Sequence, residues 1–594
     1  MPFRSMVAAG VLSCLSPGYA LAATLVVDIQ AEEELVDTLQ SASLVAQAIN
    51  EGTETRRDIV AAAQADYSRL LAVLFEAGFF GPTISILVDG VEASTLPTVG
   101  TSGSVGTVTL SVQTGAAFVF GQARIAPLPP NAFPPEGFAP GAPAGTAILR
   151  EATTDGTEAW RAIGHAKAAL VAQQIQANHP ANELNADLTL SPGPKLSYGD
   201  LVVTGNEDVL TRQITRIADL RPGQTFDPDQ VQESARRLQR TGAFRSVSIT
   251  EAEEIGAGDT LPMTVQVVER LPRRFGAGAE IGTTEGLSLS AFWLHRNLTG
   301  YADSLRIEGE IEGIGGDSGG EDYTLGFAYN RPATFNPETD LFITGEIASL
   351  DEPTYSSDSA ELVVGARRIV SDEFQYSYGV SFEKSRVTDA FGTRNFEIIS
   401  LPLEAQYDRR NDALNPSDGF YIEAGLQPFH GRLTAGSGLR FTADMRGYQH
   451  FGAQDGTVLA ARLQLGSVVG PDLADVPADD LFYSGGGGTV RGQPYQSLAV
   501  TLPNGREVGG RSFLGLSGEV RQSVTDTIGV VGFVDAGLVS EGSGWSDGET
   551  HVGAGIGLRY DTGIGPIRVD LGVPVSGPDD NSGVEIYIGI GQAF

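Results

Sequence analysis

The chain has 594 residues, of which 41% are hydrophobic, 75 are glycine and one is cysteine. Its formal net charge of −35 argues against a nucleic-acid partner, because neutralising phosphates requires clustered lysine and arginine. No apolar run is long enough for a membrane-spanning helix. The mean hydropathy of −0.03 still allows a membrane β-barrel, whose strands mix outward apolar with inward polar residues.

The N-terminus, residues 1–22, is expected to be a secretory signal peptide. Arg4 supplies the positive charge, a short apolar stretch follows, and Ala20-Leu21-Ala22 forms an A-x-A cleavage site. We expect cleavage after Ala22, with Ala23 as the second choice. The single cysteine, Cys14, lies inside this segment, and a lipoprotein signal around it is the weaker alternative. A mature chain without cysteine suits an oxidising periplasm.

Helix-like and strand-like patterns alternate from the signal to about residue 272. Residues Arg57 to Ala77 read as a helix that ends before Gly78, a residue suited to a helix C-terminus. Thr83–Val88 reads as the strand that follows. The same order recurs with a helix over Gln230–Arg240 and a strand over Phe244–Ile249.

A second repetition indicates three similar units in this half. Residues Leu110–Gly121 resemble Leu188–Gly199, 78 positions later, and Val265–Gly276 is a looser third copy. The middle unit departs from the pattern because it follows an insertion rich in proline and glycine, from Pro127 to Gly145. Its boundaries are therefore the least defined.

From about Arg274 the helical patterns stop and alternation with period two takes over. Phe374–Phe382, Leu459–Leu465 and Val584–Ile590 each place apolar residues at every second position. One apolar and one polar face is what a water-filled barrel in lipid requires. About 320 residues at roughly 20 per strand and loop predict about 16 antiparallel strands. A soluble propeller or sandwich, the alternative, would leave the apolar face uncovered.

A glycine-rich run followed by one arginine interrupts this barrel region. An Arg inside a barrel needs carboxylate partners, because its guanidinium cannot lose its proton. Alternation on the strands Phe513–Arg521 and Ile528–Ala536 directs Glu519 and Asp535 at the lumen. The residues of the run that we single out are Gly485, Gly486, Gly487, Gly488, Val490, Arg491 and Gly492.

The glycine-rich run, together with Phe533-Val534-Asp535-Ala536-Gly537, resembles signatures of the outer-membrane insertase superfamily that includes BamA, TamA and the two-partner secretion transporters. The resemblance implies that the loop folds into the barrel lumen and that Glu519 and Asp535 are the partners of Arg491. Asp408–Asp412 and Asn297–Ala302 resemble further signatures with structural roles in turns. No catalytic site, metal or cofactor is implied.

The resemblance also implies the domain order: signal peptide 1–22, POTRA-like domains (βααββ) at 23–114, 115–197 and 198–272, and an outer-membrane barrel at 273–594. Three POTRA-like domains favour the TamA branch. That branch implies a TamB-like periplasm-spanning partner, clients that are unfolded outer-membrane β-barrels or autotransporters, and contact with outer-membrane lipid.

An insertase of this kind would part its first and last strands to offer a client an edge. Glycines in the first strand, Phe275–Gly282, weaken pairing and side-chain packing there. The alternatives are a two-partner secretion transporter that passes a single exoprotein through the lumen, and a passive porin. The seam is expected to contain Gly276, Gly278, Gly282, Ile588, Ile590 and Phe594.

One motif imitates an enzyme. Gly316-Asp317-Ser318-Gly319-Gly320 spells the active-site pentapeptide of chymotrypsin-like proteases. A nucleophilic serine needs a base and an orienting acid beside it, and none of the histidines before it, His165, His179 and His295, stands in the family's histidine motif. Glycine and aspartate are ordinary turn residues. We expect a turn, and no enzyme.

Overall fold

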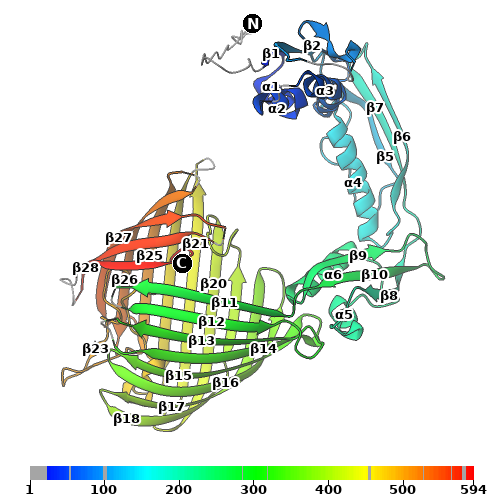
Figure 1. Cartoon of the computed structure of the whole chain (residues 1–594). Coiled ribbons are helices and arrows are strands. Elements are labelled where there is room, and N and C mark those ends of the chain that lie inside the picture. The colour runs from blue at the N-terminus through cyan, green and yellow to red at the C-terminus, as the bar shows by residue number, and fades with distance from the viewer. Residues whose placement is uncertain are drawn as a thin grey trace. The chain divides into compact units, whose positions relative to one another are not determined.

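The computed structural model describes residues 23–52, 55–97, 103–283, 285–316, 319–452, 456–525, 527–563, 565–577 and 583–594. Residues 1–22, which are expected to be the signal peptide, lie outside these ranges, as do Asp317 and Ser318 of the pentapeptide. The chain divides into two compact units. The first runs to Gly199 and also takes in 222–229 and 254–261, and the second holds the remainder. Figure 1 labels many of the elements.

The helices and short 3-10 turns are α1 (Glu33–Ala42), α2 (Leu44–Asn50), α3 (Arg56–Glu76), η1 (Ala93–Thr95), α4 (Thr146–Ala162), α5 (Thr211–Ala218), α6 (Pro228–Arg240), η2 (Leu473–Asp475) and η3 (Ala478–Asp480). The strands before the barrel are β1 (Thr24–Gln30), β2 (Thr83–Val88), β3 (Val91–Glu92), β4 (Thr107–Gln113), β5 (Val119–Ala126), β6 (Ala169–Asn178), β7 (Glu183–Ser191), β8 (Ser197–Thr204), β9 (Phe244–Glu251) and β10 (Thr260–Glu269).

The remaining strands are β11 (Arg273–Gly282), β12 (Gly286–His295), β13 (Ser304–Ile314), β14 (Asp322–Asn336), β15 (Thr339–Glu352), β16 (Tyr355–Ile369), β17 (Phe374–Asp389), β18 (Gly392–Ser400), β19 (Leu403–Asp408), β20 (Gly419–Leu433), β21 (Gly438–Phe451), β22 (Thr457–Val469), β23 (Val500–Thr501), β24 (Glu507–Val508), β25 (Ser512–Ser523), β26 (Ile528–Ser540), β27 (Glu549–Tyr560), β28 (Ile567–Ser576) and β29 (Glu585–Ile590).

The first module packs α1 to α3 on a sheet in the order β1-β4-β2-β3. Helix α3 begins at the Thr55 cap, whose hydroxyl accepts from the Asp58 N–H. A buried carboxylate, Asp66, ties this helix to the start of the preceding helix α2 by accepting from the Ser43 hydroxyl at 2.6 Å and from the Leu44 N–H at 2.7 Å. The helix and strand expected from the sequence, Arg57–Ala77 and Thr83–Val88, are α3 and β2.

The second module has a sheet in the order β5-β7-β6 covered by α4. The expected βααββ order fails here, because within its described residues α4 is the one helix between β5 and β6. The proline-rich segment 127–145 occupies the place of the other helix. Proline lacks the N–H that a helix interior needs, so this segment cannot form a regular helix.

The third module has a sheet in the order β8-β10-β9 with α5 and α6. Arg237 of α6 is buried and donates to the carbonyls of Ile217 and Ala218 at 3.0 and 2.8 Å, which satisfies the C-terminal end of α5. The repetition noted in the sequence coincides with the last strand of each module, β4, β7 and β10, and the start of the next strand.

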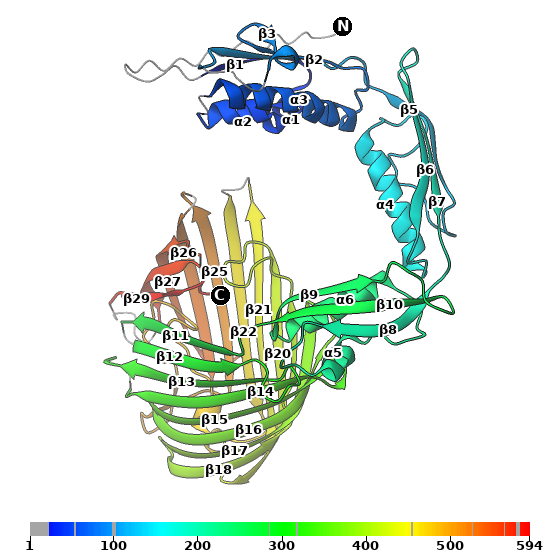
Figure 2. The ribbon, with the colours of Figure 1, turned by 45° about the vertical axis from the view of Figure 1, so that its right-hand side comes forward.

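The barrel is one closed antiparallel sheet that runs from β11 to β29, and the short hairpin β23–β24 lies outside it (Figure 2). Strands β18 and β19 both pair with β17 and β20, so they are two halves of one interrupted strand. With β18 and β19 counted as one strand, the barrel has sixteen strands within the described residues. No helix among the described residues is long and apolar enough to cross a membrane.

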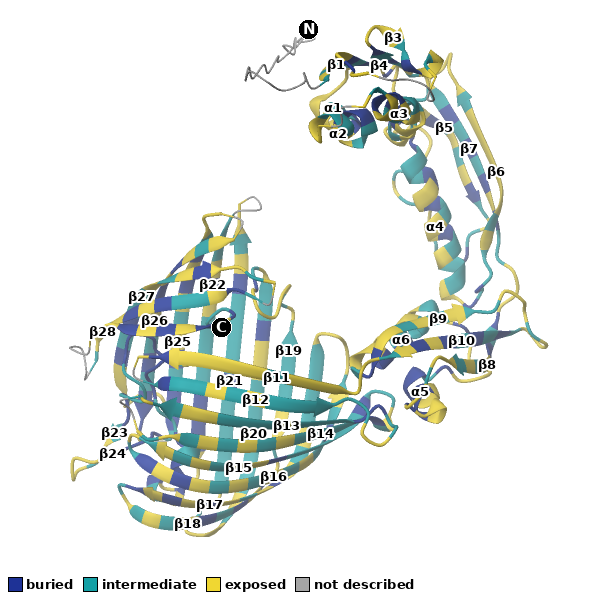
Figure 3. Cartoon of the chain, viewed as in Figure 1, coloured by how far each residue is buried: buried dark blue, intermediate teal, exposed yellow. Residues whose placement is uncertain are grey.

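Side chains on the barrel alternate in exposure as the sequence predicts. On β25, Leu516 and Val520 are 50% and 49% exposed, whereas Glu519 between them is 3% exposed. On β26, Val534 is 55% exposed and its neighbour Asp535 is 1% exposed. Figure 3 shows the banded pattern along the strands, with β11 exposed along most of its length. The outer face is apolar and the inner face carries the charges.

Candidate functional site

The segment between β22 and β25, residues 470–511, reaches the inner face of the barrel wall, and we name it the lumen loop. It contains η2, η3 and the hairpin β23–β24. Its glycine-rich part carries Arg491, which is 2% exposed, and Val490, which is fully buried. A charged side chain this deeply buried requires partners on the wall.

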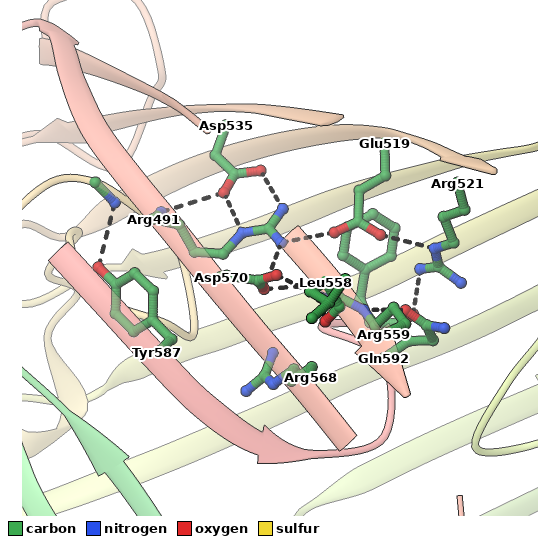
Figure 4. Close-up of polar contacts among 12 residues, drawn as sticks. Arg491, Glu519, Arg521, Asp535, Leu558, Arg559, Arg568, Asp570, Tyr587 and Gln592 are labelled. Atoms are coloured by element: carbon green, nitrogen blue, oxygen red, sulfur yellow. Dashed lines mark hydrogen bonds and ion pairs between the residues drawn. The ribbon is translucent and has the colours of Figure 1, made fainter. Parts of the chain in front are cut away.

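Arg491 meets three carboxylates on three different strands (Figure 4). It forms a two-pronged pair with Asp535 of β26, with Nε–Oδ2 at 2.7 Å and Nη2–Oδ1 at 3.0 Å. Its Nη1 lies 2.6 Å from Oε1 of Glu519 on β25 and 3.3 Å from Oδ2 of Asp570 on β28. The guanidinium carbon also lies 3.7 Å from the ring centroid of Phe533. The structure therefore brings together Arg491, Glu519 and Asp535, as expected, and adds Asp570.

Two further arginines complete this cluster. Arg521 of β25 lies 2.8 Å from Glu519, and Arg559 of β27 lies 2.5 Å from Asp570. With Arg491 they place three cations against three carboxylates, so the buried cluster has no net charge. Sequence reasoning missed Asp570, Arg521 and Arg559. Strand alternation could have found them, because it directs their side chains into the lumen. Arg521, for example, lies two residues after Glu519 on the same strand and therefore faces the same side.

The loop backbone touches the wall at glycine positions. Gly492 has φ +88°, and a Cβ there would lie 2.6 Å from the Val573 backbone. On the wall, a Cβ at Gly553 would lie 1.9 Å from the Arg491 carbonyl oxygen. Gly485 and Gly486 also have positive φ, whereas a Cβ at Gly488 would meet nothing within 4 Å. Glycine is thus required where the loop meets the wall.

The lumen loop is tied to both edges of the barrel sheet. The Gly487 N–H donates to Oε1 of Glu285, in the turn between β11 and β12, at 2.8 Å. The Gly492 N–H donates to the hydroxyl of Tyr587 on β29 at 3.2 Å (Figure 4). One loop therefore contacts the first strand pair and the last strand of the barrel.

The junction of β11 and β29, which we name the seam, is short. Within the described residues these strands pair at two positions, Ile281 with Ile588 and Gly282 with Tyr587. Ile586 adds a contact by donating its N–H to the Thr283 hydroxyl at 2.8 Å. By contrast, β11 pairs with β12 along its whole length from Arg273 to Gly282. The edge of β11 that faces β29 therefore has no strand partner over residues 273–280 in the described structure.

Of the residues expected in the seam, only Gly282 and Ile588 pair across it. Gly276 and Gly278 lie on β11 beyond the paired stretch, and Ile590 pairs with Ile567 of β28. These positions differ from expectation because the stagger of the two strands limits their overlap. Beside the paired stretch, Glu280 of β11 forms a side-chain ion pair with Arg568 of β28 at 2.8 Å, so this contact also spans the seam.

Phe594 was expected in the seam, but it does not lie there. Strand β29 ends at Ile590, Gly591 takes φ +95°, and the chain leaves the sheet. The Phe594 ring is 6% exposed and packs against Tyr448 and Ala460, and its carbonyl accepts from Nη2 of Arg521 at 3.1 Å. The terminal segment thus turns away from β11 and leaves its edge open.

The two turn motifs noted in the sequence have structural contacts. Arg410 pairs with Asp408 at 2.8 Å, and the Asp412 carboxylate accepts from the Leu414 and Asn415 N–H groups at 2.7 Å each. In the other motif the Asn297 side chain accepts from the Ala302 N–H at 3.0 Å. Both side chains satisfy backbone groups inside turns.

A closed antiparallel barrel with an apolar outer face and a charged interior, preceded by small α+β modules, defines an outer-membrane β-barrel protein with periplasmic domains. The model of the Omp85 superfamily domain matches residues 297–594, and that of the surface antigen variable number repeat, POTRA, matches residues 197–270. The chain belongs to the Omp85 superfamily. It is therefore an outer-membrane protein insertase or transporter of the class that handles unfolded β-barrel clients.

Two solved structures illustrate the fold. BamA from Haemophilus ducreyi lacking POTRA domains 1–3 is similar with a TM-score of 0.61 at 16% identity, over 76% of this chain and 95% of that one. CdiB from Acinetobacter baumannii is similar with a TM-score of 0.52 at 13% identity, over 80% of this chain and 90% of that one. At this identity, the likeness concerns the fold.

Proposed function

We propose that this protein is an insertase resembling TamA, which assembles β-barrel and autotransporter clients by offering them the free edge of β11. The observation that carries the proposal is the two-position seam, with the edge of β11 open over residues 273–280. This open stretch begins at the periplasmic end of the barrel, because β11 follows directly from the third POTRA module. A client strand arriving from the periplasm would meet that edge first.

The physical reason for such an edge is the cost of bare backbone in lipid. A client strand entering the membrane carries N–H and C=O groups that hydrocarbon cannot satisfy, at several kcal/mol for each group. Pairing with β11 satisfies one side of the strand. Two ladder pairs, the contact between Thr283 and Ile586 and the Arg568–Glu280 ion pair must separate before the whole of β11 is available.

The lumen loop gives the seam a support that can be released. It contacts Glu285 beside β11 and Tyr587 on β29, while the Arg491 cluster holds it to the wall. We propose that the loop stabilises the closed seam and that its release favours opening. Under the same proposal, a TamB-like periplasm-spanning protein delivers clients to the POTRA modules.

The competing function is secretion of a single exoprotein through the lumen. Depletion of the protein in its own cell, followed by comparison of outer-membrane and extracellular proteomes, separates the two. The insertase predicts that several β-barrel proteins or autotransporters decline together. Loss of one exoprotein with unchanged outer-membrane barrels would overturn the proposal in favour of secretion.

A further inference from the structure

A cavity of about 520 Å³ lies between helix α5 and the periplasmic end of the barrel. Helix α5 lies beside the end of β14 in Figures 1 and 2, and both belong to the same compact unit. Three arginines converge on this cavity, two from α5 and one from β14. The lining residues that matter here are Arg212, Thr215, Arg216, Tyr301, Arg331 and Thr334.

Neutral groups hold all three arginines in place. Arg216 donates to the carbonyls of Ala333 and Thr334 at 2.6 and 2.5 Å. Arg212 donates to the Tyr301 hydroxyl at 2.5 Å, and the guanidinium carbon of Arg331 lies 3.9 Å from the centroid of the same ring. Within the described residues, none of the three guanidinium groups lies within 4.0 Å of a carboxylate oxygen.

The carboxylate of the neighbouring turn is already engaged. Asp303 is fully buried and accepts from the Thr299 N–H at 2.9 Å, the Thr299 hydroxyl at 2.8 Å and the Tyr329 hydroxyl at 3.1 Å. In a chain of net charge −35, three arginines directed at one cavity without an anionic partner are unusual. Their N–H groups remain available for an anion from outside the chain.

The depth of the cavity identifies the source of that anion. On β14, every second residue faces the lipid, as the exposed side chains of Tyr323, Leu325 and Phe327 show. Arg331 stands at an even spacing from them and therefore lies on the same face of the strand. Arg331 lies four residues beyond Phe327, or about 13 Å along the strand toward the periplasm. Tyr329 stands between them, where aromatic girdles of membrane barrels lie. Arg331 is therefore at the level of the lipid headgroups.

We propose that this cavity binds the phosphate of a phospholipid in the periplasmic leaflet. The planar guanidinium group suits the two-pronged recognition of phosphate. A phosphate here would join Arg212 and Arg216 of the third POTRA module to Arg331 of the barrel, and so would fix α5 against the membrane. This inference depends on the outer-membrane location and is independent of the insertase mechanism.

The test uses the full-length protein, purified in uncharged detergent, depleted of lipid and titrated with three probes. These are short-chain phosphatidylglycerol, inorganic phosphate and diacylglycerol, which lacks the phosphate. Native mass spectrometry measures bound lipid, and heat-modifiable gel mobility checks that the barrel is folded. The test variant is Arg212→Gln with Arg331→Gln. The matched control is Arg306→Gln, an arginine on β13 that stacks on Phe292 and pairs with Glu308 at 2.6 Å.

We expect phosphatidylglycerol to bind at least tenfold more weakly to the test variant and unchanged to the control, with diacylglycerol not retained. Arg212→Lys with Arg331→Lys keeps the charges and should bind with intermediate affinity, which keeps the test valid if the glutamine variant fails to fold. Equal binding by wild type and test variant would overturn the proposal. Retention of inorganic phosphate but not of phosphatidylglycerol would overturn the lipid assignment.

Discussion

Arg491 of the lumen loop and Asp535 of β26 form a two-pronged ion pair that a backbone contact reinforces. The guanidinium meets both carboxylate oxygens, and the Arg491 N–H donates to Oδ2 of Asp535 at 3.1 Å. Both side chains are at most 2% exposed. This pair of residues therefore fixes both the backbone and the side chain of the loop at Arg491 to the barrel wall.

Arg491→Ala should release the lumen loop. Removing one partner of a buried ion pair costs about 3–5 kcal/mol, and here it leaves three carboxylates facing two arginines. We expect faster cleavage of residues 470–511 by external protease and impaired client assembly. Arg506→Ala is the matched control, because Arg506 is exposed on the same loop and contacts the Ala390 carbonyl. Equal protease protection in both variants would contradict the assigned role.

A double-mutant cycle should measure the Arg491–Asp535 pair itself. Removing both partners leaves less uncompensated charge than removing Arg491 alone, so Arg491→Ala with Asp535→Ala should be less destabilised than the sum of the single variants. Contacting charged pairs typically couple by about 0.5–3 kcal/mol. Urea unfolding in detergent micelles gives the four free energies. Strict additivity would show that the two side chains do not interact in solution.

Gly492→Ala should loosen the loop although it adds only a methyl group. Its φ of +88° is strained for alanine, and the new Cβ would lie 2.6 Å from the Val573 backbone. We expect a loss of more than about 1 kcal/mol in unfolding free energy, the scale of such backbone strain. Gly488→Ala is the control and should be nearly neutral, because no atom lies within 4 Å of its Cβ position. If the two variants are equally stable, the close contact at Gly492 is not required.

Strand alternation was sufficient to predict which side chains face the lumen. It placed Glu519 and Asp535 correctly because period two depends only on the local backbone. The same alternation on β28, where Ile567 and Leu571 are exposed, also directs Asp570 inward. Asp570 was missed because the prediction of carboxylate partners considered only the strands Phe513–Arg521 and Ile528–Ala536.

The seam could not be predicted from the same pattern. Alternation says which way a residue faces, but not which residue of a distant strand lies opposite. Ile588 pairs with Ile281 because of the stagger between β11 and β29, a relationship set by the whole barrel. By strand alternation alone, Phe594 would face outward with Ile588 and Ile590. Gly591 redirects the chain before it, so that Phe594 packs against Tyr448 inside the barrel, a contact that depends on tertiary packing.

The most direct test of the insertase account is to lock the seam. Ile281→Cys with Ile588→Cys places thiols on directly opposite residues, whose spacing across neighbouring strands suits a disulfide. The single native cysteine, Cys14, lies in the segment expected to be cleaved, so the engineered thiols are the only ones expected in the mature protein. Ala279→Cys with Leu289→Cys is the matched control, because it joins β11 to β12, a pair that stays closed in this account.

The measurement is the rate at which the reconstituted protein assembles a urea-unfolded barrel client, chosen from those that decline on depletion. The account predicts that oxidation of the seam pair stops assembly, that a reductant restores it, and that oxidation of the control pair has no effect. Assembly at the full rate by a fully cross-linked seam would contradict the account, because the edge of β11 could then not be freed from β29.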